Sequence, residues 1–414
     1  MKKYVKTAMM KAGQYFGEAG DHAMAAACFA QYLERYPIDP GKHHRAKKKG
    51  EPVRVDASEE PVDEMAQVAR YALAREYAAM GETSKLVETC KPYIAGLRDD
   101  KFRVSALKLL GFNAGKAGQY EDAIDAYATL LDEYGLETVD DKGRVIPLPQ
   151  KDRLRQKQHN WDGFRMPPPK DLDAGEIRFA LGYLYWKQEL WEKAALTLAP
   201  FANDPALREN KSRDRALYMA AQSAYKIGDY AGGVKSIQAL LRDYPKFEAF
   251  EEACVYAARG YAETKNWSEL ELACKTFAAD FPKSDRRPRM DYFAALSQMN
   301  SGAKDKGLSA LKSLAASETF EDVRADACFQ VAMYFLNSTS GGTEQAYDYL
   351  DKSVKFHATD VACVELAKCA IKLDKLDVAR DTLARAQREF PKFVRRFEVD
   401  ALLIEVQKKL AKKK

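Results

Sequence analysis

The chain has 414 residues, of which 46% are hydrophobic, and a formal net charge of +5 at pH 7. This is ample material for a core. Its longest apolar stretch, around residues 23–30, is far shorter than the roughly 18 residues of a transmembrane span, and Lys6 and Lys11 interrupt any apolar leader. The sequence therefore excludes a membrane-spanning helix. It favours a cytoplasmic protein, or a periplasmic one whose leader was removed.

About nine helical hairpins are expected along the chain, each marked by a residue suited to a tight turn between two helices. In the second half these turns recur every 37 residues, with one atypical unit at residues 334–354. Repetition at a fixed period indicates a stack in which neighbouring units cover one another's apolar faces. The expected turns lie near Gly20, Gly81, Gly118, Glu189, Gly228, Lys265, Gly302 and Asp374.

Small residues recur at fixed distances from these turns, where the two helices of a hairpin can approach closely. Prolines such as Pro37 and Pro245 then end several of the second helices, because proline lacks a backbone donor. The small residues seven positions before the turns are Gly13, Ala74, Gly111, Gly182, Ala221, Ala258, Ala295 and Ala367. The small residues that lie five positions after a turn are Ala25, Ala123, Ala194, Gly233 and Ala379.

This pattern resembles the tetratricopeptide repeat, whose signature is W-x2-L-G-x2-Y, then A-x3-F, then P. Leu181, Gly182 and Tyr185 match its first half, and Ala25 and Phe29 match its second. The resemblance covers nearly the whole chain. It implies an all-α, right-handed superhelical solenoid closed by a C-terminal capping helix.

Several repeat endings, at residues 34–37, 242–245 and 280–284, also look like those of bacterial envelope-assembly repeat proteins.

The prediction divides the chain into six segments. The segments are a first hairpin (1–37), a basic insert (38–60), further hairpins (61–135), a basic insert with prolines and aromatics (136–171), further hairpins (172–392), and a capping helix with a basic tail (393–414).

The two inserts and the tail concentrate positive charge. Residues 41–54 carry a net +5, residues 142–170 a net +6 and residues 405–414 a net +4, so the rest of the chain is acidic. Basic loops with interleaved aromatics can bind nucleic acid or an acidic protein face. A lysine-rich loop can equally be a solvated connector. The candidate contacts are Lys42, Arg45, Lys47, Lys48, Lys49, Arg153, Arg155, Lys157, Trp161 and Arg165.

The resemblance also implies a concave groove lined by the first helix of each hairpin. A strip of rings with an arginine is what a peptide-binding groove presents, although the same rings could pack against the next hairpin as core. The Lys, Asn and Arg clamp of repeats that hold a carboxylate is absent, since Lys108 and Phe112 occupy such positions. An apolar or aromatic ligand segment is therefore favoured. The candidate groove residues are Phe179, Tyr183, Trp186, Tyr218, Gln222, Tyr225, Arg259 and Tyr292.

Catalysis, cofactors and metals find no support in the sequence. The chain lacks GxxxxGK, GxGxxG after a strand, HExxH and GxSxG motifs. Its seven cysteines are scattered and indicate core residues in a reducing compartment. A metal site from His357, Cys363 and Cys369 is disfavoured, because a six-residue spacing does not place both thiolates on one helical face. We expect no catalytic residues, no cofactor and no metal.

The sequence thus predicts a non-enzymatic, bacterial-type scaffold or adaptor that binds a segment of a partner protein in the groove and could organise a larger assembly. Two alternatives stay open. One is a nucleic-acid or anionic-surface binding module that acts through the basic inserts. The other is a bacterial envelope-assembly factor without its leader.

Overall fold

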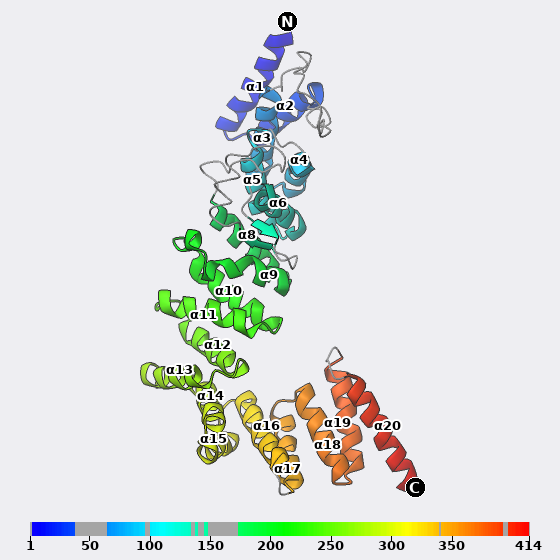
Figure 1. The fold of residues 1–414 in the computed structure, drawn as a ribbon. Helices are drawn as coiled ribbons and strands as arrows, with labels where there is room; N and C mark the ends of the chain where they lie inside the picture. The colour runs from blue at the N-terminus through cyan, green and yellow to red at the C-terminus, as the bar shows by residue number, and fades with distance from the viewer. Residues whose placement is uncertain are drawn as a thin grey trace, which may run out of the picture. The chain divides into compact units, whose positions relative to one another are not determined.

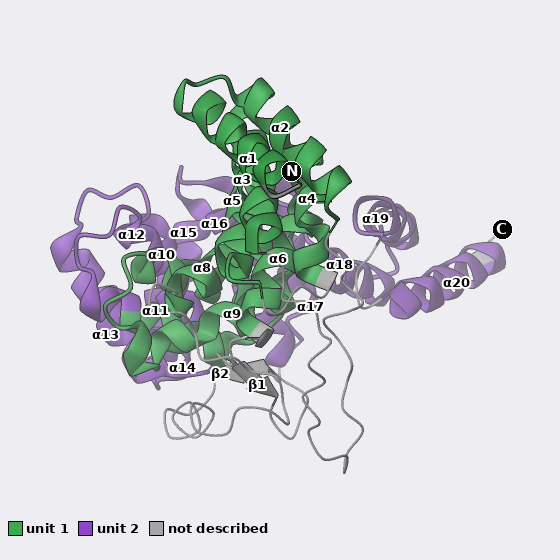
Figure 2. Ribbon diagram, turned by 90° about the horizontal axis from the view of Figure 1, so that it is seen from above, with its two compact units in different colours: residues 1–239 green, residues 240–414 purple. Residues whose placement is uncertain are grey.

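The computed structural model describes residues 2–37, 64–95, 100–133, 137–139, 145–147, 173–338, 341–391 and 396–413. Almost every element in these ranges is a helix (Figure 1). The chain divides into two compact units, Met1–Ala239 (unit 1) and Leu240–Lys414 (unit 2), which are coloured separately in Figure 2.

Unit 1 is a series of helical hairpins, in which each helix from α1 to α10 packs against the next along the chain and Gly233 of α11 lies against Tyr225 of α10. Its last helix, α11, contains the boundary with unit 2. The helices are α1 (Lys2–Glu18) with α2 (His22–Arg35), α3 (Glu64–Met80) with α4 (Thr83–Ala95), α5 (Arg103–Lys116) with α6 (Tyr120–Glu133), α8 (Ala174–Lys187) with α9 (Trp191–Leu198), and α10 (Arg213–Lys226) with α11 (Tyr230–Asp243). Two short 3-10 helices, η2 (Ala199–Ala202) and η3 (Pro205–Leu207), connect α9 to α10.

Unit 2 continues the same pattern and ends on one extra helix. Its helices are α12 (Phe250–Glu263) with α13 (Trp267–Asp280), α14 (Arg287–Asn300) with α15 (Lys304–Ala316), α16 (Glu321–Asn337) with α17 (Thr343–Phe356), α18 (Asp360–Lys372) with α19 (Leu376–Glu389), and finally α20 (Arg396–Lys413). The described residues therefore contain nine helical hairpins and a terminal helix. The predicted all-α solenoid of hairpins is confirmed, and its atypical unit is the pair α16 and α17.

One pair of strands lies in the second insert, where no strand was expected. Strands β1 (Glu137–Val139) and β2 (Val145–Pro147) are antiparallel, with Thr138 opposite Ile146. The β-branched residues Val139, Val145 and Ile146 favour this conformation. Most of both inserts lies outside the described residues, so the six predicted segment boundaries stay a prediction.

The turns within the hairpins adopt the left-handed backbone conformation at the predicted positions. The five predicted glycines have φ between 71° and 99°, and Glu189, Lys265 and Asp374 each have φ of 56°. Gly341, with φ of 67°, supplies the turn of the atypical hairpin. At seven of these turns the amide of the next residue donates back into the preceding helix. Asp229 N–H, for example, donates to Ala224 O at 2.8 Å.

Close approach of the two helices explains the small residue in the first helix of each hairpin. A Cβ atom added to Gly182 would lie 2.3 Å from Leu198 Cδ2, and one added to Gly111 would lie 2.6 Å from the Tyr127 ring. Neither contact is possible without movement. The alanines at the equivalent positions of other hairpins, such as Ala221, are fully buried.

Arginines at the start of a helix, one buried (Arg213) and one half-buried (Arg287), connect consecutive hairpins by hydrogen-bonding carbonyl groups at the end of the preceding helix. Arg213, the first residue of α10, donates from Nε to Phe201 O at 3.0 Å. Arg287, the first residue of α14, donates from Nη1 to Ala278 O at 3.3 Å. The last carbonyls of a helix have no partner inside that helix, so these arginines satisfy acceptors that burial would otherwise leave unpaired.

Helix α20 covers the last hairpin, as predicted. Val399 and Val406 are completely buried and belong to the cluster that contains Leu376 and Leu383 of α19. An ion pair between Lys368 Nζ of α18 and Glu398 Oε1, 2.6 Å apart, also ties α20 to this hairpin.

Candidate binding surface

The predicted groove residues fall into two groups, one in each unit. Helix α8 carries Phe179, Tyr183 and Trp186, while α10 carries Tyr218, Gln222 and Tyr225, and all six lie in unit 1. Arg259 of α12 and Tyr292 of α14 lie in unit 2. Each group is therefore described by itself.

Three rings form a continuous row along one face of α8, which we call the aromatic strip (Phe179, Tyr183 and Trp186). Their spacing of four and then three residues places them on the same side of the helix. Ring centroids are 6.4 Å apart both between Phe179 and Tyr183 and between Tyr183 and Trp186. The residue exposure of Tyr183 is 39%, and the other two are half-buried. The strip is thus a supported surface with accessible rings.

A hydrogen bond and an edge-to-face contact hold Trp186 in place. Its indole Nε1–H donates to Gln222 Oε1 of α10 at 3.2 Å, which fixes α8 and α10 relative to each other at this point. Its ring also meets the ring of Trp191, the first residue of α9, at 81° and a centroid distance of 6.4 Å. Trp186 and Gln222 were both candidate groove residues, and the sequence did not predict the direct bond between them.

Positive charge borders the strip on one side. Lys187 Nζ lies 5.9 Å from the centroid of the Tyr183 ring and 5.6 Å from that of Tyr120, close enough for a cation–π interaction. A hydrogen bond with the Tyr120 side chain raises the pKa of Lys187. The ammonium group is therefore charged at neutral pH and available to an acidic group of a ligand.

Phe112 is an exposed ring of α5 that was not among the candidate groove residues. It follows Gly111 as Tyr183 follows Gly182, and 64% of its surface is exposed. An ion pair between Lys108 Nζ and Glu176 Oε2, 3.7 Å apart, links α5 to α8 beside it. The sequence signal for Phe112 is its position directly after the small residue of its helix, which it shares with Tyr183.

Tyr225 lies in the hairpin core. It is 6% exposed, and its ring fills the space above Gly233, where an added Cβ would lie only 2.1 Å from Tyr225 Cε1. Its centroid is also 5.5 Å from that of Tyr230. Tyr218, two turns earlier on α10, is half-buried. The core alternative considered for these rings therefore describes Tyr225.

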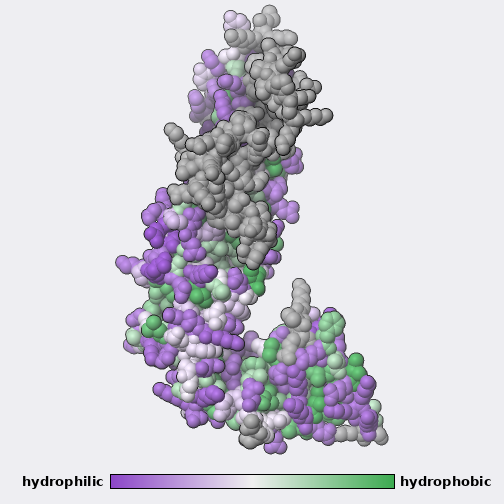
Figure 3. Space-filling model, viewed as in Figure 1, coloured by the Kyte–Doolittle hydropathy of each residue, from purple (hydrophilic) through white to green (hydrophobic). Residues whose placement is uncertain are grey.

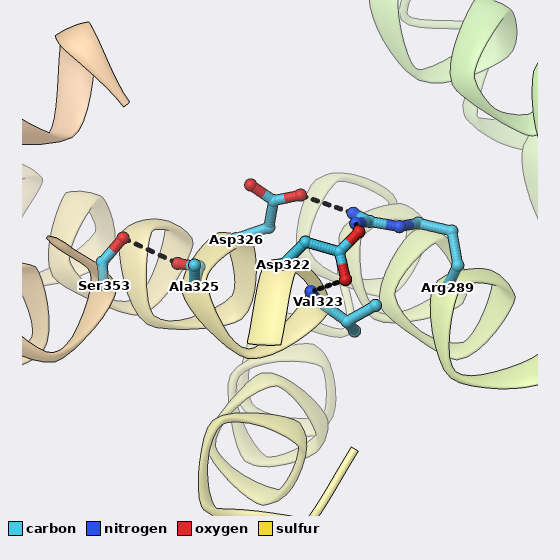
Figure 4. Close-up of polar contacts among 6 residues, drawn as sticks. All are labelled: Arg289, Asp322, Val323, Ala325, Asp326 and Ser353. Atoms are coloured by element: carbon cyan, nitrogen blue, oxygen red, sulfur yellow. Dashed lines mark hydrogen bonds and ion pairs between the residues drawn. The ribbon is translucent and has the colours of Figure 1, made fainter. Parts of the chain in front are cut away.

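In unit 2 the inward-facing residues of α14 bind the neighbouring helix. Arg289 donates to Asp326, and from Nη2 to Asp322 Oδ2 at 2.5 Å, so that two carboxylates of α16 face its guanidinium (Figure 4). One turn later, Tyr292 is buried, and burial raises the pKa of its hydroxyl. Arg259 is exposed on α12. Tyr292 is thus enclosed by the protein, unlike Tyr183 of unit 1.

The candidate contacts of the basic inserts lie outside the described residues, and the anionic-partner hypothesis stays a prediction. These residues are Lys42, Arg45, Lys47, Lys48, Lys49, Arg153, Arg155, Lys157, Trp161 and Arg165.

Thiols and carboxylates form no metal centre in the described part of the chain, where no group of three or more His, Cys, Asp or Glu side chains could hold an ion. All seven cysteines are free thiols. Burial raises the pKa of Cys363 to about 11 and also raises the pKa of Cys369.

Within the described ranges, no helix combines the length and the hydropathy needed to cross a membrane.

The tetratricopeptide-repeat family model matches two segments of the chain. The first, residues 7–37, covers most of α1 and α2, and the second, residues 215–246, covers most of α10 and all of α11. Each matched segment is thus one helical hairpin of the fold. No curated protein matches the sequence.

Several solved structures resemble the chain in fold. A tetratricopeptide-repeat protein from Parabacteroides merdae is 14% identical, with 73% of this chain and 98% of that chain covered and a TM-score of 0.45. A thermophilic repeat protein from Thermus thermophilus is 18% identical, with 46% and 99% covered and a TM-score of 0.37. Yeast Tom70 is 12% identical, with 99% and 97% covered and a TM-score of 0.39. At such identities a likeness concerns the fold alone.

Proposed function

Because the chain is a tetratricopeptide-repeat protein, and hence a protein-interaction scaffold, we propose that it binds an extended segment of a partner protein along the aromatic strip of α8 and across Phe112 of α5. It does so without catalysing a reaction. The observation that carries this proposal is the row of Phe179, Tyr183 and Trp186, whose rings are held in contact yet remain partly accessible.

The fixed position of Trp186 favours binding. Its hydrogen bond to Gln222 and its contact with Trp191 restrict the indole before a ligand arrives. Binding then costs less conformational entropy, because the indole is already ordered in the free protein. Aromatic anchors also supply most of the binding energy in many protein interfaces.

The chemistry of the surface favours a ligand with apolar or aromatic side chains. Phe112 and Tyr183 stand at positions where a carboxylate clamp would need polar residues, and both expose carbon-rich surface. Lys187, at the edge of the strip, suits an acidic residue that flanks the apolar ones. We therefore propose an extended segment with apolar anchors and an acidic flank.

The test uses fluorescent peptides in which apolar residues alternate with polar ones, with and without an acidic flank, and measures binding by fluorescence anisotropy. Tyr183→Ala is expected to weaken binding roughly tenfold, because truncation of a central aromatic anchor costs about 1–2 kcal/mol. Tyr4→Ala is the matched control, since Tyr4 is a tyrosine of α1 with 83% exposure and lies outside the strip. Equal affinities for the two variants would refute the proposal.

Ionic strength separates this function from the anionic-partner alternative. Contacts to rings tolerate high salt, whereas binding through phosphate neutralisation weakens steeply as salt rises. Peptide binding that persists at high salt and depends on Tyr183 supports the proposal. Binding to single-stranded nucleic acid that high salt abolishes, and that is lost when Lys47, Lys48 and Lys49 become Gln, would support the alternative.

We also propose a cytoplasmic location. All seven cysteines are free thiols, and five of them are buried within helices. Thiols of this kind fit a reducing compartment.

A further inference from the structure

The terminal helix α20 has an outward-facing apolar stripe. Phe397 is 86% exposed and Ile404 53% exposed. Ala401 lies between them at helical spacing and is also exposed. Hydrophobic surface is visible among hydrophilic residues in the region of α18–α20 (Figure 3). The described residues therefore leave this stripe uncovered.

The opposite face of α20 is already used by the fold. Val399 and Val406 are completely buried against α18 and α19, and Leu403 packs beside them. The helix is therefore apolar on two sides, of which its own unit covers only one.

The charges of α20 are separated along its length. From its start to Glu405 it contains Glu398, Asp400 and Glu405, with Arg396 as the only base, whereas from Lys408 onward all its charged residues are basic. Two such helices attract each other when they run antiparallel, because each acidic part then faces a basic part. A parallel pair would place like charges together.

We propose that α20 packs antiparallel against α20 of a second copy of this chain, through the stripe of Phe397, Ala401 and Ile404, to form a two-fold symmetric dimer. A two-fold interface uses the same patch on both copies, so the patch must be self-complementary. The charge separation of α20 meets this requirement.

The side chains also match in size when the two stripes are centred on Ile404. Phe397 then lies opposite Ala411 of the second copy, so that a large ring meets a small residue at each end. Asp400 lies opposite Lys408 of the second copy. With a rise of 1.5 Å per residue, the stripe from Phe397 to Ala411 is about 21 Å long.

Helix α1 is the other exposed terminal helix, and it fits α20 less well. Tyr4 and Tyr15 expose most of their surface, so α1 also offers apolar area. However, α1 carries four lysines and one glutamate, which would face the lysines of α20. Such a head-to-tail contact would also produce rings or open chains of molecules, not a two-fold symmetric dimer.

Sedimentation equilibrium on the full chain tests the dimer. The wild type is expected to move from monomer to dimer with rising concentration, and Ile404→Glu to raise the dissociation constant at least tenfold. Leu272→Glu is the matched control, since Leu272 is 60% exposed on α13 of the same unit, and it is expected to change the constant less than twofold. A wild type that stays monomeric at all concentrations, species larger than dimers, or equal effects of both variants would overturn the proposal.

A charge exchange tests the antiparallel register. Asp400→Lys alone and Lys408→Asp alone are each expected to weaken self-association, because the homodimer of either variant faces like charges at both ends. An equimolar mixture is expected to dimerise at least as well as the wild type, because both contacts then join a lysine and an aspartate. Failure of the mixture to recover dimers, with both variants folded by circular dichroism, would overturn the antiparallel arrangement.

Discussion

Two left-handed turns, one with glycine and one with lysine, allow a test in which each residue is replaced by the other. Gly228 and Lys265 occupy equivalent turns, with φ of 78° and 56°. The following amides make the same bond, since Asp229 N–H donates to Ala224 O and Asn266 N–H to Tyr261 O, each at 2.8 Å. A Cβ at Gly228 would contact nothing within 4 Å, and Lys265 is exposed. Packing therefore contributes little, and backbone conformation decides the outcome.

The expected magnitude follows from two opposing effects. A residue with a Cβ pays about 1–2 kcal/mol in the left-handed region, and glycine avoids that cost. Glycine in turn gains about 0.4–1 kcal/mol of conformational freedom in the unfolded chain. We expect Lys265→Gly to raise the free energy of unfolding by about 0.5–1 kcal/mol, and Gly228→Lys to lower it by a similar amount.

The assay is urea denaturation, followed by circular dichroism and by hydrogen exchange at the amides of the affected hairpin. Hydrogen exchange is needed because the two units need not unfold together, so a single transition is not guaranteed. Destabilisation by Lys265→Gly, or stabilisation by Gly228→Lys, would refute the view that the sign of φ governs these turns.

Three further predictions concern the interior. Gly182→Ala should lower the free energy of unfolding by about 1–3 kcal/mol, because the added methyl group overpacks the contact with Leu198. In a double-mutant cycle measured by urea denaturation, Leu198→Ala should destabilise the Gly182→Ala variant less than it destabilises the wild type. Additive effects would contradict the close approach of the two helices. Arg213→Met should cost about 1–3 kcal/mol in the same assay, because it leaves a carbonyl of η2 unpaired, and a neutral outcome would contradict that role. Burial raises the pKa of Cys274 from 9.0 to about 12. At pH 8 the thiolate fraction of Cys274 should be about a thousandfold below that of an ordinary thiol. Mass spectrometry after alkylation should therefore find the less buried Cys28 modified first. The reverse order would contradict the packing of α13.

Local chemistry made most of the fold predictable from the sequence. A glycine such as Gly118 followed by a new apolar period marks a turn, and the small residue Gly111 before it marks the helix contact, because both effects act within one hairpin. The direct bond between Trp186 and Gln222 joins different hairpins. It depends on how two hairpins stack, which no local pattern encodes.

The difference between Trp186 and Tyr225 shows where the prediction of the site ended. Both lie four residues after the small residue of their helix, yet Trp186 is half-buried and Tyr225 is buried. The decisive residue is Gly233 on the partner helix, which stands where Ala123 and Ala194 stand in other hairpins. Its missing side chain leaves room for the Tyr225 ring.

The contact between Trp186 and Trp191 gives the surface an optical signal of its own. Both indoles lie in unit 1 in edge-to-face contact, and the Nε1–H of Trp186 is hydrogen-bonded to an amide side chain. A ligand that covers the strip would change the polarity around this pair and shift its emission. Trp267, the first residue of α13 in unit 2, lies away from the strip along the chain and provides an internal reference. Occupancy can therefore be followed in the unlabelled protein.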